Sequence, residues 1–197
     1  MWLHLHAGRR PAGRSSEGQV NFAHEDALAR LAKQYSPGSY LEVGVWRGDS
    51  LRVVLDNCLP ARLILCDLWS GRYECGFTGH GHIEAMLKQR GFAGAVEYLD
   101  GDSHELLPDY FEKGVGDIDL ILVDGDHTEY GAWADLVDCW EFLSIGGHIV
   151  FDDLLHAGYP HMQETFKRFR ERLGAQAALE SLELRKMDGC GVLRRLS

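Results

Sequence analysis

The chain has 197 residues, of which 45% are hydrophobic and 25% charged, with a formal net charge of −10. These values predict one globular domain large enough to bury a core. The acidic balance argues against a nucleic-acid partner, because such partners normally need a concentrated basic surface. No apolar stretch is long enough to span a bilayer and no signal-peptide core follows Met1, so we expect no membrane association and a cytoplasmic protein.

Residues 1–20 are predicted to form a flexible N-terminal segment, and residues 21–197 a single domain. A first helix is expected at 22–34, and strands then alternate with helices. We predict strands at 40–45, 62–66, 95–99, 118–123 and 148–151. We predict the intervening helices at 49–57, 103–111, 130–143 and 161–173. Between the first two of these, a glycine- and histidine-rich loop at 70–82 leads into a further helix that ends at 90.

The end of the chain is predicted to be a β-hairpin of residues 179–187 and 191–195, with its turn at Asp188-Gly189. Alternating β and α elements with apolar strands require a mostly parallel sheet covered on both faces. The predicted fold is therefore α/β: a Rossmann-like, doubly wound, seven-stranded sheet that is mostly parallel and ends in an antiparallel hairpin.

Five cysteines are present, at positions 58, 66, 75, 139 and 190, and none forms a C-x-x-C pair. Three of them, Cys58, Cys66 and Cys139, fall within apolar runs. An odd number of cysteines in such positions favours buried thiols in a reducing compartment.

The most informative segment is residues 40–50, which reads as a strand, a turn with Gly44 and Gly48, and a helix start. It differs from the G-x-G-x-x-G motif of NAD enzymes, since the middle glycine is absent and Trp46 occupies the turn. A turn carrying carboxylates suits a ligand with a cationic or hydroxyl-rich face better than a pyrophosphate. This favours S-adenosylmethionine.

Carboxylates follow nearly every predicted strand, at the sheet edge where open α/β folds bind their ligands. Asp67 stands about twenty residues after the glycine turn, a spacing that suits a ribose diol, and Leu68 beside it offers an apolar wall. Asp102 and Ser103 follow the third strand and could meet an adenine ring. Ser103 could equally be the N-cap of the next helix.

A second constellation consists of Asp124, Asp152 and Asp153. Three carboxylates converging without a basic partner would repel one another, and a divalent cation would remove that repulsion. Ligands that are all oxygen suit Mg²⁺, which would lower the pKa of a substrate hydroxyl. Asp126 or His127 could then act as the general base, although His127 could equally bond a backbone carbonyl or the adenine edge.

These segments resemble the class I S-adenosylmethionine-dependent methyltransferases, and more closely the methyltransferase family 24 group, which includes metal-dependent sugar O-methyltransferases. The resemblance extends from about Phe22 to the end of the chain and rests on five segments in order. They are 41–44 with Gly48, Asp67, 101–103, 121–127 and 146–153.

The resemblance implies donor contacts from Glu42 and Gly44 to the methionine part, from Asp67 to the ribose and from Asp102-Ser103 to the adenine. It also implies Mg²⁺ at Asp124, Asp152 and Asp153, with Asp126 as the base. The full set assigned to the donor is Glu42, Gly44, Trp46, Gly48, Ser50, Asp67, Leu68, Asp102, Ser103 and Asp124. The expected reaction is O-methylation of a small-molecule hydroxyl, whether sugar, phenol or another natural product.

Three other readings remain open: an NAD-linked oxidoreductase, a non-catalytic nucleoside-binding domain, and a metal-dependent hydrolase using the same carboxylates. The segment Gly79-His80-Gly81-His82 could hold a transition metal, although such histidines are more often polar lid residues. Trp2 and Trp133 are expected to be exposed, which would be compatible with a homodimer.

Overall fold

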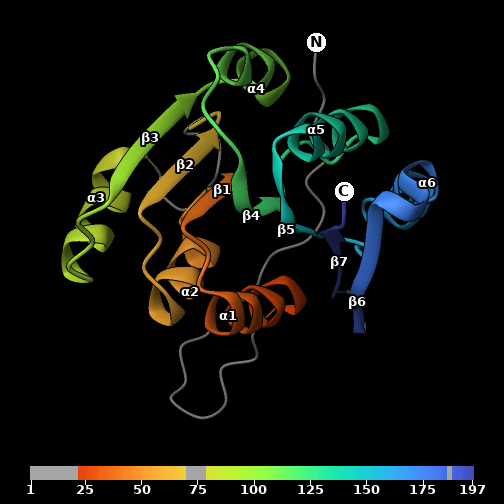
Figure 1. Ribbon diagram of the computed structural model, residues 1–197, viewed down its shortest axis with the longest axis horizontal. Helices are drawn as coiled ribbons and strands as arrows, with labels where there is room; N and C mark the ends of the chain where they lie inside the picture. The colour runs from red at the N-terminus through yellow and green to blue at the C-terminus, as the bar shows by residue number, and fades with distance from the viewer. Residues whose placement is uncertain (1–21, 70–78, 186–187) are drawn as a thin grey trace.

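The computed structural model describes residues 22–69, 79–185 and 188–197, so the predicted flexible segment lies outside the described part. Helices and strands alternate along it (Figure 1). The strands are β1 (Ser39–Val43), β2 (Arg62–Asp67), β3 (Ala95–Asp100), β4 (Ile118–Val123), β5 (Leu143–Phe151), β6 (Ala177–Arg185) and β7 (Asp188–Arg195). The helices are α1 (Ala23–Tyr35), α2 (Asp49–Asn57), α3 (His80–Gln89), α4 (Ser103–Glu112), α5 (Glu129–Glu141), α6 (Met162–Leu173) and the 3₁₀ turn η1 (Gly174–Gln176).

The seven strands form one sheet in the order β3-β2-β1-β4-β5-β7-β6. The first five strands in the chain pair with one another in parallel, and β7 pairs antiparallel with both β5 and β6. The strand order reverses beside β1, where β2 and β4 flank it. This confirms the predicted doubly wound, mostly parallel sheet with a C-terminal hairpin.

Helices cover both faces of the sheet (Figure 1) and bury an apolar layer on each. Helices α1, α2 and α3 pack on one face, around Tyr40 and Leu63, while α4, α5 and α6 pack on the other, around Leu41 and Ile64. Successive residues of a strand point to opposite faces of the sheet, and here helices cover both faces. Most residues of β1, β2 and β4 are therefore apolar and buried, whichever face they point to. The acidic exceptions within β1 and β4, Glu42 and Asp119, stand one residue from a strand end.

Most boundaries lie within one or two residues of the sequence prediction, and three regions differ by more. Residues 143–147, expected at a helix end and a glycine break, already belong to β5, which continues past a register shift opposite β4. His80 and His82, expected in a loop, lie in the first turn of α3. Asp188 and Gly189, expected to form the hairpin turn, pair with Arg185 and Leu184 and so belong to β7.

None of the described helices is long and apolar enough to cross a membrane. The four described cysteines are free, and Cys66, Cys139 and Cys190 are buried. The apolar runs predicted burial of Cys58, Cys66 and Cys139, and Cys58 is only partly buried. Trp133, expected to be exposed, is partly buried against the α6 side chains Phe169, Arg168 and Arg172.

Candidate functional site

The parallel strands end in register at one edge of the sheet. Val43 lies opposite both Cys66 and Val123, and Val123 lies opposite Phe151. The residues that follow these positions are therefore neighbours in space. They are Gly44, Asp67, Asp124 and Asp152.

The turn after β1 requires glycine at position 44. Gly44 has φ 88°, and a Cβ placed there would lie 2.0 Å from the carbonyl oxygen of Asp124. A side chain would thus collide with backbone, in a conformation that L residues rarely adopt. From the sequence, Gly44 was expected to let a ligand lie close to the backbone. The structure shows that it also allows the turns after β1 and β4 to contact each other.

Asp67 joins the turns after β1 and β2. Its side chain is buried, with Oδ2 accepting the backbone N–H of Trp46 at 2.7 Å and Oδ1 that of Trp69 at 2.6 Å. Both donors have positive φ, 48° and 45°. Each carboxylate oxygen retains a second lone pair, so the group can still accept hydrogen bonds from a diol. Leu68, 55% exposed, lies beside it.

Glu42 is buried in β1 beneath this turn. The hydroxyl of Tyr40, two residues earlier and so on the same face of the strand, donates to its Oε2 at 2.9 Å. Burial raises the pKa of Glu42 well above its usual range, against the opposing effect of the Tyr40 hydrogen bond. A buried carboxyl of this kind can accept a proton or a hydrogen bond from a cationic ligand.

The turn after β3 caps α4. Asp102 is the N-cap, and its Oδ1 accepts the N–H of His104 at 3.0 Å. The alternative role of Ser103 as the N-cap is therefore wrong, because Ser103 is already the first helical residue, and it is buried.

Asp126 lies in a polar cluster that the sequence analysis missed. Its Oδ1 accepts the Thr128 N–H at 2.8 Å, and its Oδ2 lies 3.3 Å from His104 Nε2. His104 Nδ1 is in turn 3.4 Å from Oδ1 of Asp135, a fully buried side chain in α5. Burial raises the pKa of Asp135 to about 6. A signal was available, because Asp135 shares a helix face with the apolar residues Ala132, Leu136 and Cys139.

His127 bridges two of the predicted metal ligands. Its Nε2 lies 3.2 Å from Asp124 Oδ1 and 2.9 Å from Asp153 Oδ2, and Tyr159 stacks on its ring at 4.4 Å. Burial alone would lower the pKa of His127, but the two carboxylates outweigh it and raise the pKa to about 11. In this arrangement the ring carries a proton at neutral pH, and it can accept a proton from another group only after it leaves the carboxylates and loses its own proton.

A second histidine was not anticipated. His24 in α1 lies with Nδ1 2.7 Å from Asp152 Oδ2 and Nε2 3.1 Å from Ser50 Oγ. Burial would lower its pKa, but the Asp152 carboxylate outweighs that effect and raises the pKa to about 9. His24 lies on the same helix face as Ala27, Leu28 and Leu31. A polar residue on this apolar face was the sequence signal that could have identified it as a buried site residue.

The expectation of three carboxylates without a basic partner is therefore wrong, since His24 and His127 lie among them. The donor atoms of His24, Asp124 and Asp152 lie within 4.8 Å of one another, as do those of Asp124, His127 and Asp153. The carboxylates still suit a cation, because Oδ1 of Asp152 is buried with no hydrogen-bond partner and burial raises the pKa of this group to about 6.

His80 and His82 belong to neither of these donor clusters, which are the two found among residues 22–69, 79–185 and 188–197. His80 pairs with Asp100 at 2.7 Å and stacks on Tyr98 at 3.9 Å. The expected lid histidines thus lie on the first turn of α3.

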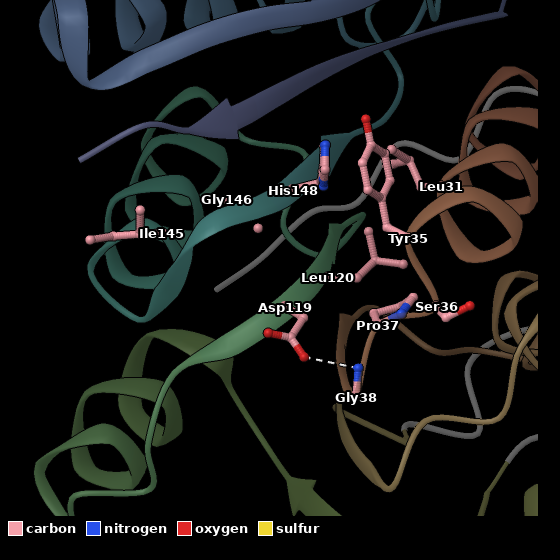
Figure 2. Close-up of a pocket in the computed structure, with 11 residues that line it drawn as sticks. Leu31, Tyr35, Ser36, Pro37, Gly38, Asp119, Leu120, Ile145, Gly146 and His148 are labelled. Atoms are coloured by element: carbon pink, nitrogen blue, oxygen red, sulfur yellow. Dashed lines mark hydrogen bonds between the residues drawn. The ribbon is translucent and has the colours of Figure 1, made fainter.

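A hollow of about 320 Å³ lies at the opposite edge of the sheet, between the start of β1 and the middle of β5 (Figure 2). Asp119 lines it, and its Oδ2 accepts the N–H groups of Gly38 and Ser39 at 2.9 and 3.1 Å while Oδ1 accepts the Ser144 hydroxyl at 2.9 Å. His148 also lines it, buried against Tyr35 at 4.5 Å. Burial lowers the pKa of His148.

Comparison with known proteins gives consistent results. A family model described as a methyltransferase domain matches residues 41–154, which is more than half of the 197 residues. Tricin synthase 1 from Oryza sativa subsp. japonica is 26% identical over 189 residues, covering 86% of this chain and 71% of that protein. Catechol O-methyltransferase from Niastella koreensis is 26% identical over 163 residues, covering 78% and 69%.

Among solved structures, the O-methyltransferase TomG from Streptomyces achromogenes, involved in tomaymycin synthesis and determined in complex with SAM, has a similar fold. It gives a TM-score of 0.68 at 19% identity, covering 88% of this chain and 79% of that one. At this identity the likeness supports the fold alone.

Proposed function

This chain belongs to the methyltransferase domain family, and we propose that it transfers the methyl group of S-adenosylmethionine to a hydroxyl oxygen of a small molecule. The observation that carries the proposal is the register of β1, β2, β4 and β5, whose ends bring a glycine turn and three aspartates together. The names of the relatives, among them a catechol O-methyltransferase, support an oxygen acceptor.

The methionine part of the donor is assigned to the turn after β1 and the start of α2. Glu42 would accept hydrogen bonds from the ammonium group, and the backbone between Gly44 and Gly48 would line the ligand. Ser50 lies in the first turn of α2, where backbone N–H groups face outward and favour a carboxylate. Trp46, next to Asp67 through its N–H, would cover the ligand.

The nucleoside part is assigned to the turns after β2 and β3. Asp67 would accept hydrogen bonds from the ribose hydroxyls through its remaining lone pairs, with Leu68 against the ring. Asp102 and Ser103, at the start of α4, would meet the adenine edge. Asp124, after β4, would lie between the donor and the acceptor.

Methyl transfer needs alignment of donor and acceptor more than it needs covalent help, since the sulfonium loses its charge as the new bond forms. A divalent cation would be held by Asp124, Asp152 and Asp153, and these carboxylates suggest Mg²⁺. Such a cation would lower the pKa of the acceptor hydroxyl. His127 would take that proton only after it has left Asp124 and Asp153 and lost its own proton to solvent. Alternatively, Asp126 would take the proton once released from His104.

The acceptor is assigned to the small-molecule class, in agreement with the net charge of −10 and with the relatives' names. The stretch 154–161 lies next to His127 through Tyr159 and His161, and would contribute to acceptor choice together with 70–82. The cysteines within the described residues are free thiols, which supports a reducing compartment such as the cytoplasm. The homodimer stays a prediction.

The test is calorimetric titration of the purified protein with S-adenosylhomocysteine. We expect micromolar binding, and a loss of about tenfold to 100-fold in the Asp67→Ala variant, which removes the proposed acceptor of the ribose hydroxyls. Asp117→Ala is the control, since Asp117 is exposed at the opposite edge and its loss changes the net charge equally.

Because Asp67 also holds two backbone N–H groups, Asp67→Asn should be measured beside it, with circular dichroism to verify folding. Absence of binding in the folded wild-type protein would overturn the donor assignment. If the protein binds S-adenosylhomocysteine but transfers no methyl group to any of a panel of sugars, phenols and catechols, the alternative of a non-catalytic nucleoside-binding domain would be favoured.

A further inference from the structure

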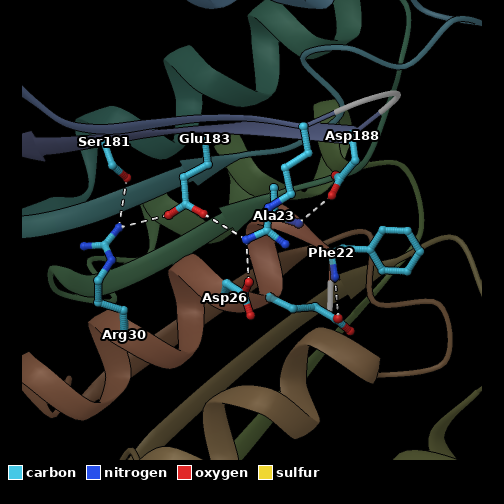
Figure 3. Close-up of polar contacts among 9 residues, drawn as sticks. Phe22, Ala23, Asp26, Arg30, Ser181, Glu183 and Asp188 are labelled. Carbon is cyan, nitrogen blue, oxygen red and sulfur yellow. Dashed lines mark hydrogen bonds and ion pairs between the residues drawn. The ribbon is translucent and has the colours of Figure 1, made fainter. Parts of the chain in front are cut away.

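Helix α1 carries His24 to the aspartates, and the C-terminal hairpin holds the start of that helix in place. The Ala23 N–H donates to Asp188 Oδ2 at 2.8 Å, Arg30 donates to Ser181 Oγ at 2.9 Å, and Arg185 pairs with Asp26 (Figure 3). The Phe22 N–H also donates to Glu25 Oε2 at 2.9 Å, which closes the first turn. The position of His24 is therefore set by several contacts besides its own.

The side chain of His24 has the environment of a ligand rather than of a core histidine. It is 3% exposed, and its two nitrogens face Asp152 and Ser50. A metal-bound histidine typically contacts the ion with one nitrogen and has the other nitrogen fixed by a hydrogen bond. Ser50 Oγ, 3.1 Å from Nε2, is placed to provide that second contact and leave Nδ1 for the ion.

The spacing of the donors agrees with a shared ion. His24 Nδ1 is 2.7 Å from Asp152 Oδ2, and the donor atoms of His24, Asp124 and Asp152 all lie within 4.8 Å of one another. Adjacent ligands of an ion bound at about 2.1 Å lie roughly 3 Å apart. The second observation is Asp152 Oδ1, which is buried without a hydrogen-bond partner, although the other oxygen of the same carboxylate pairs with His24.

We propose that His24 is a nitrogen ligand of the cation held by Asp124 and Asp152, so that the site prefers a divalent transition metal to Mg²⁺. Mg²⁺ and Ca²⁺ take oxygen ligands, whereas imidazole favours iron, cobalt, nickel and zinc. The inference rests on the cation of the proposed function, but it changes the expected ion and adds a ligand from a segment far from the other two in sequence.

The experiment compares Co²⁺ with Mg²⁺ on tag-free protein, using calorimetry for affinity and visible absorption for the ligands of bound Co²⁺. We expect wild type to bind Co²⁺ at least about tenfold more tightly than Mg²⁺. His24→Ala should lower the Co²⁺ affinity by about tenfold or more, change the Co²⁺ spectrum, and alter Mg²⁺ binding little. His24→Gln, which keeps a hydrogen bond to Asp152 within reach, should show the same loss if α1 stays folded.

His156→Ala is the matched control, because His156 follows β5 at the same edge but belongs to neither donor cluster. An unchanged ratio of Co²⁺ to Mg²⁺ affinity in folded His24 variants would overturn the proposal. A rise in affinity for both ions would also overturn it, since His24 would then be an ion-pair partner that competes with the metal.

The same samples are titrated with S-adenosylhomocysteine. Retained binding of that compound with no role for His24 in Co²⁺ affinity would refute this inference alone. Loss of S-adenosylhomocysteine binding in wild type would instead refute the donor assignment, whatever the metal result.

Discussion

The two edges of the sheet each carry aspartate and histidine side chains, but these side chains differ in how far their hydrogen bonds are satisfied. At the amino-terminal edge, Asp119 accepts three hydrogen bonds, which fix the start of β1 and the chain at Ser144. At the carboxyl edge, Asp152 is buried with one oxygen facing His24 and the other without a hydrogen-bond partner. A satisfied carboxylate stabilises the fold, whereas a buried oxygen left without a partner is available for a ligand.

The largest expected effect is at the carboxyl edge. Asp152→Asn and Asp152→Ala should reduce methyl transfer by roughly 10²–10³-fold, a loss comparable to that of a group stabilising a developing charge. Affinity for S-adenosylhomocysteine should stay within about threefold, because the donor contacts lie on other strands. Steady-state kinetics and calorimetry measure the two quantities, with the exposed Asp100→Asn as control. Normal turnover of the Asp152 variants in the presence of a chelator would show that no cation acts there.

The opposite result is expected at the amino-terminal edge. Asp119→Ala should lower the free energy of unfolding by about 1–3 kcal/mol, since it leaves the N–H groups of Gly38 and Ser39 without their acceptor. Urea unfolding measures the change, and turnover of the folded variant should match wild type. A large fall in S-adenosylhomocysteine affinity with no loss of stability would mean that the two edges are not separable.

The smallest expected effect is on the pH dependence of stability and concerns His148. Burial lowers the pKa of this side chain from its usual value of 6.5. Below pH 6.5 the unfolded chain takes up a proton that the folded protein accepts only at lower pH. The contribution of His148 to stability is therefore present above pH 6.5 and is lost as the pH falls through its lowered folded-state pKa. His148→Gln should reduce the loss of stability between pH 7.5 and 5.5 in urea unfolding. Equal losses in both proteins would mean that His148 titrates normally.

Much of the fold was readable from the sequence because it depends on local patterns. Apolar runs bounded by glycine and aspartate located the first five strands, and residues 49–57 and 118–123 were predicted with the boundaries observed. The errors lie where tertiary pairing overrides local signals, as at Leu143, which pairs with Ile118 of β4 although a helix end was predicted there. The hairpin turn was misplaced for the same reason, since Asp188 and Gly189 pair across the ladder with Arg185 and Leu184.

By itself, the sequence determined which residues follow the strands, and so which aspartates meet at one edge, because parallel strands with a common register leave little choice. It could not determine what faces those aspartates. Only the packing of α1 against β5 and the hairpin brings His24 to Asp152, and only the turn after β4 directs His127 between Asp124 and Asp153. The reason is physical: the charge balance of a buried site depends on contacts between segments distant in sequence, and these exist only once the chain has folded.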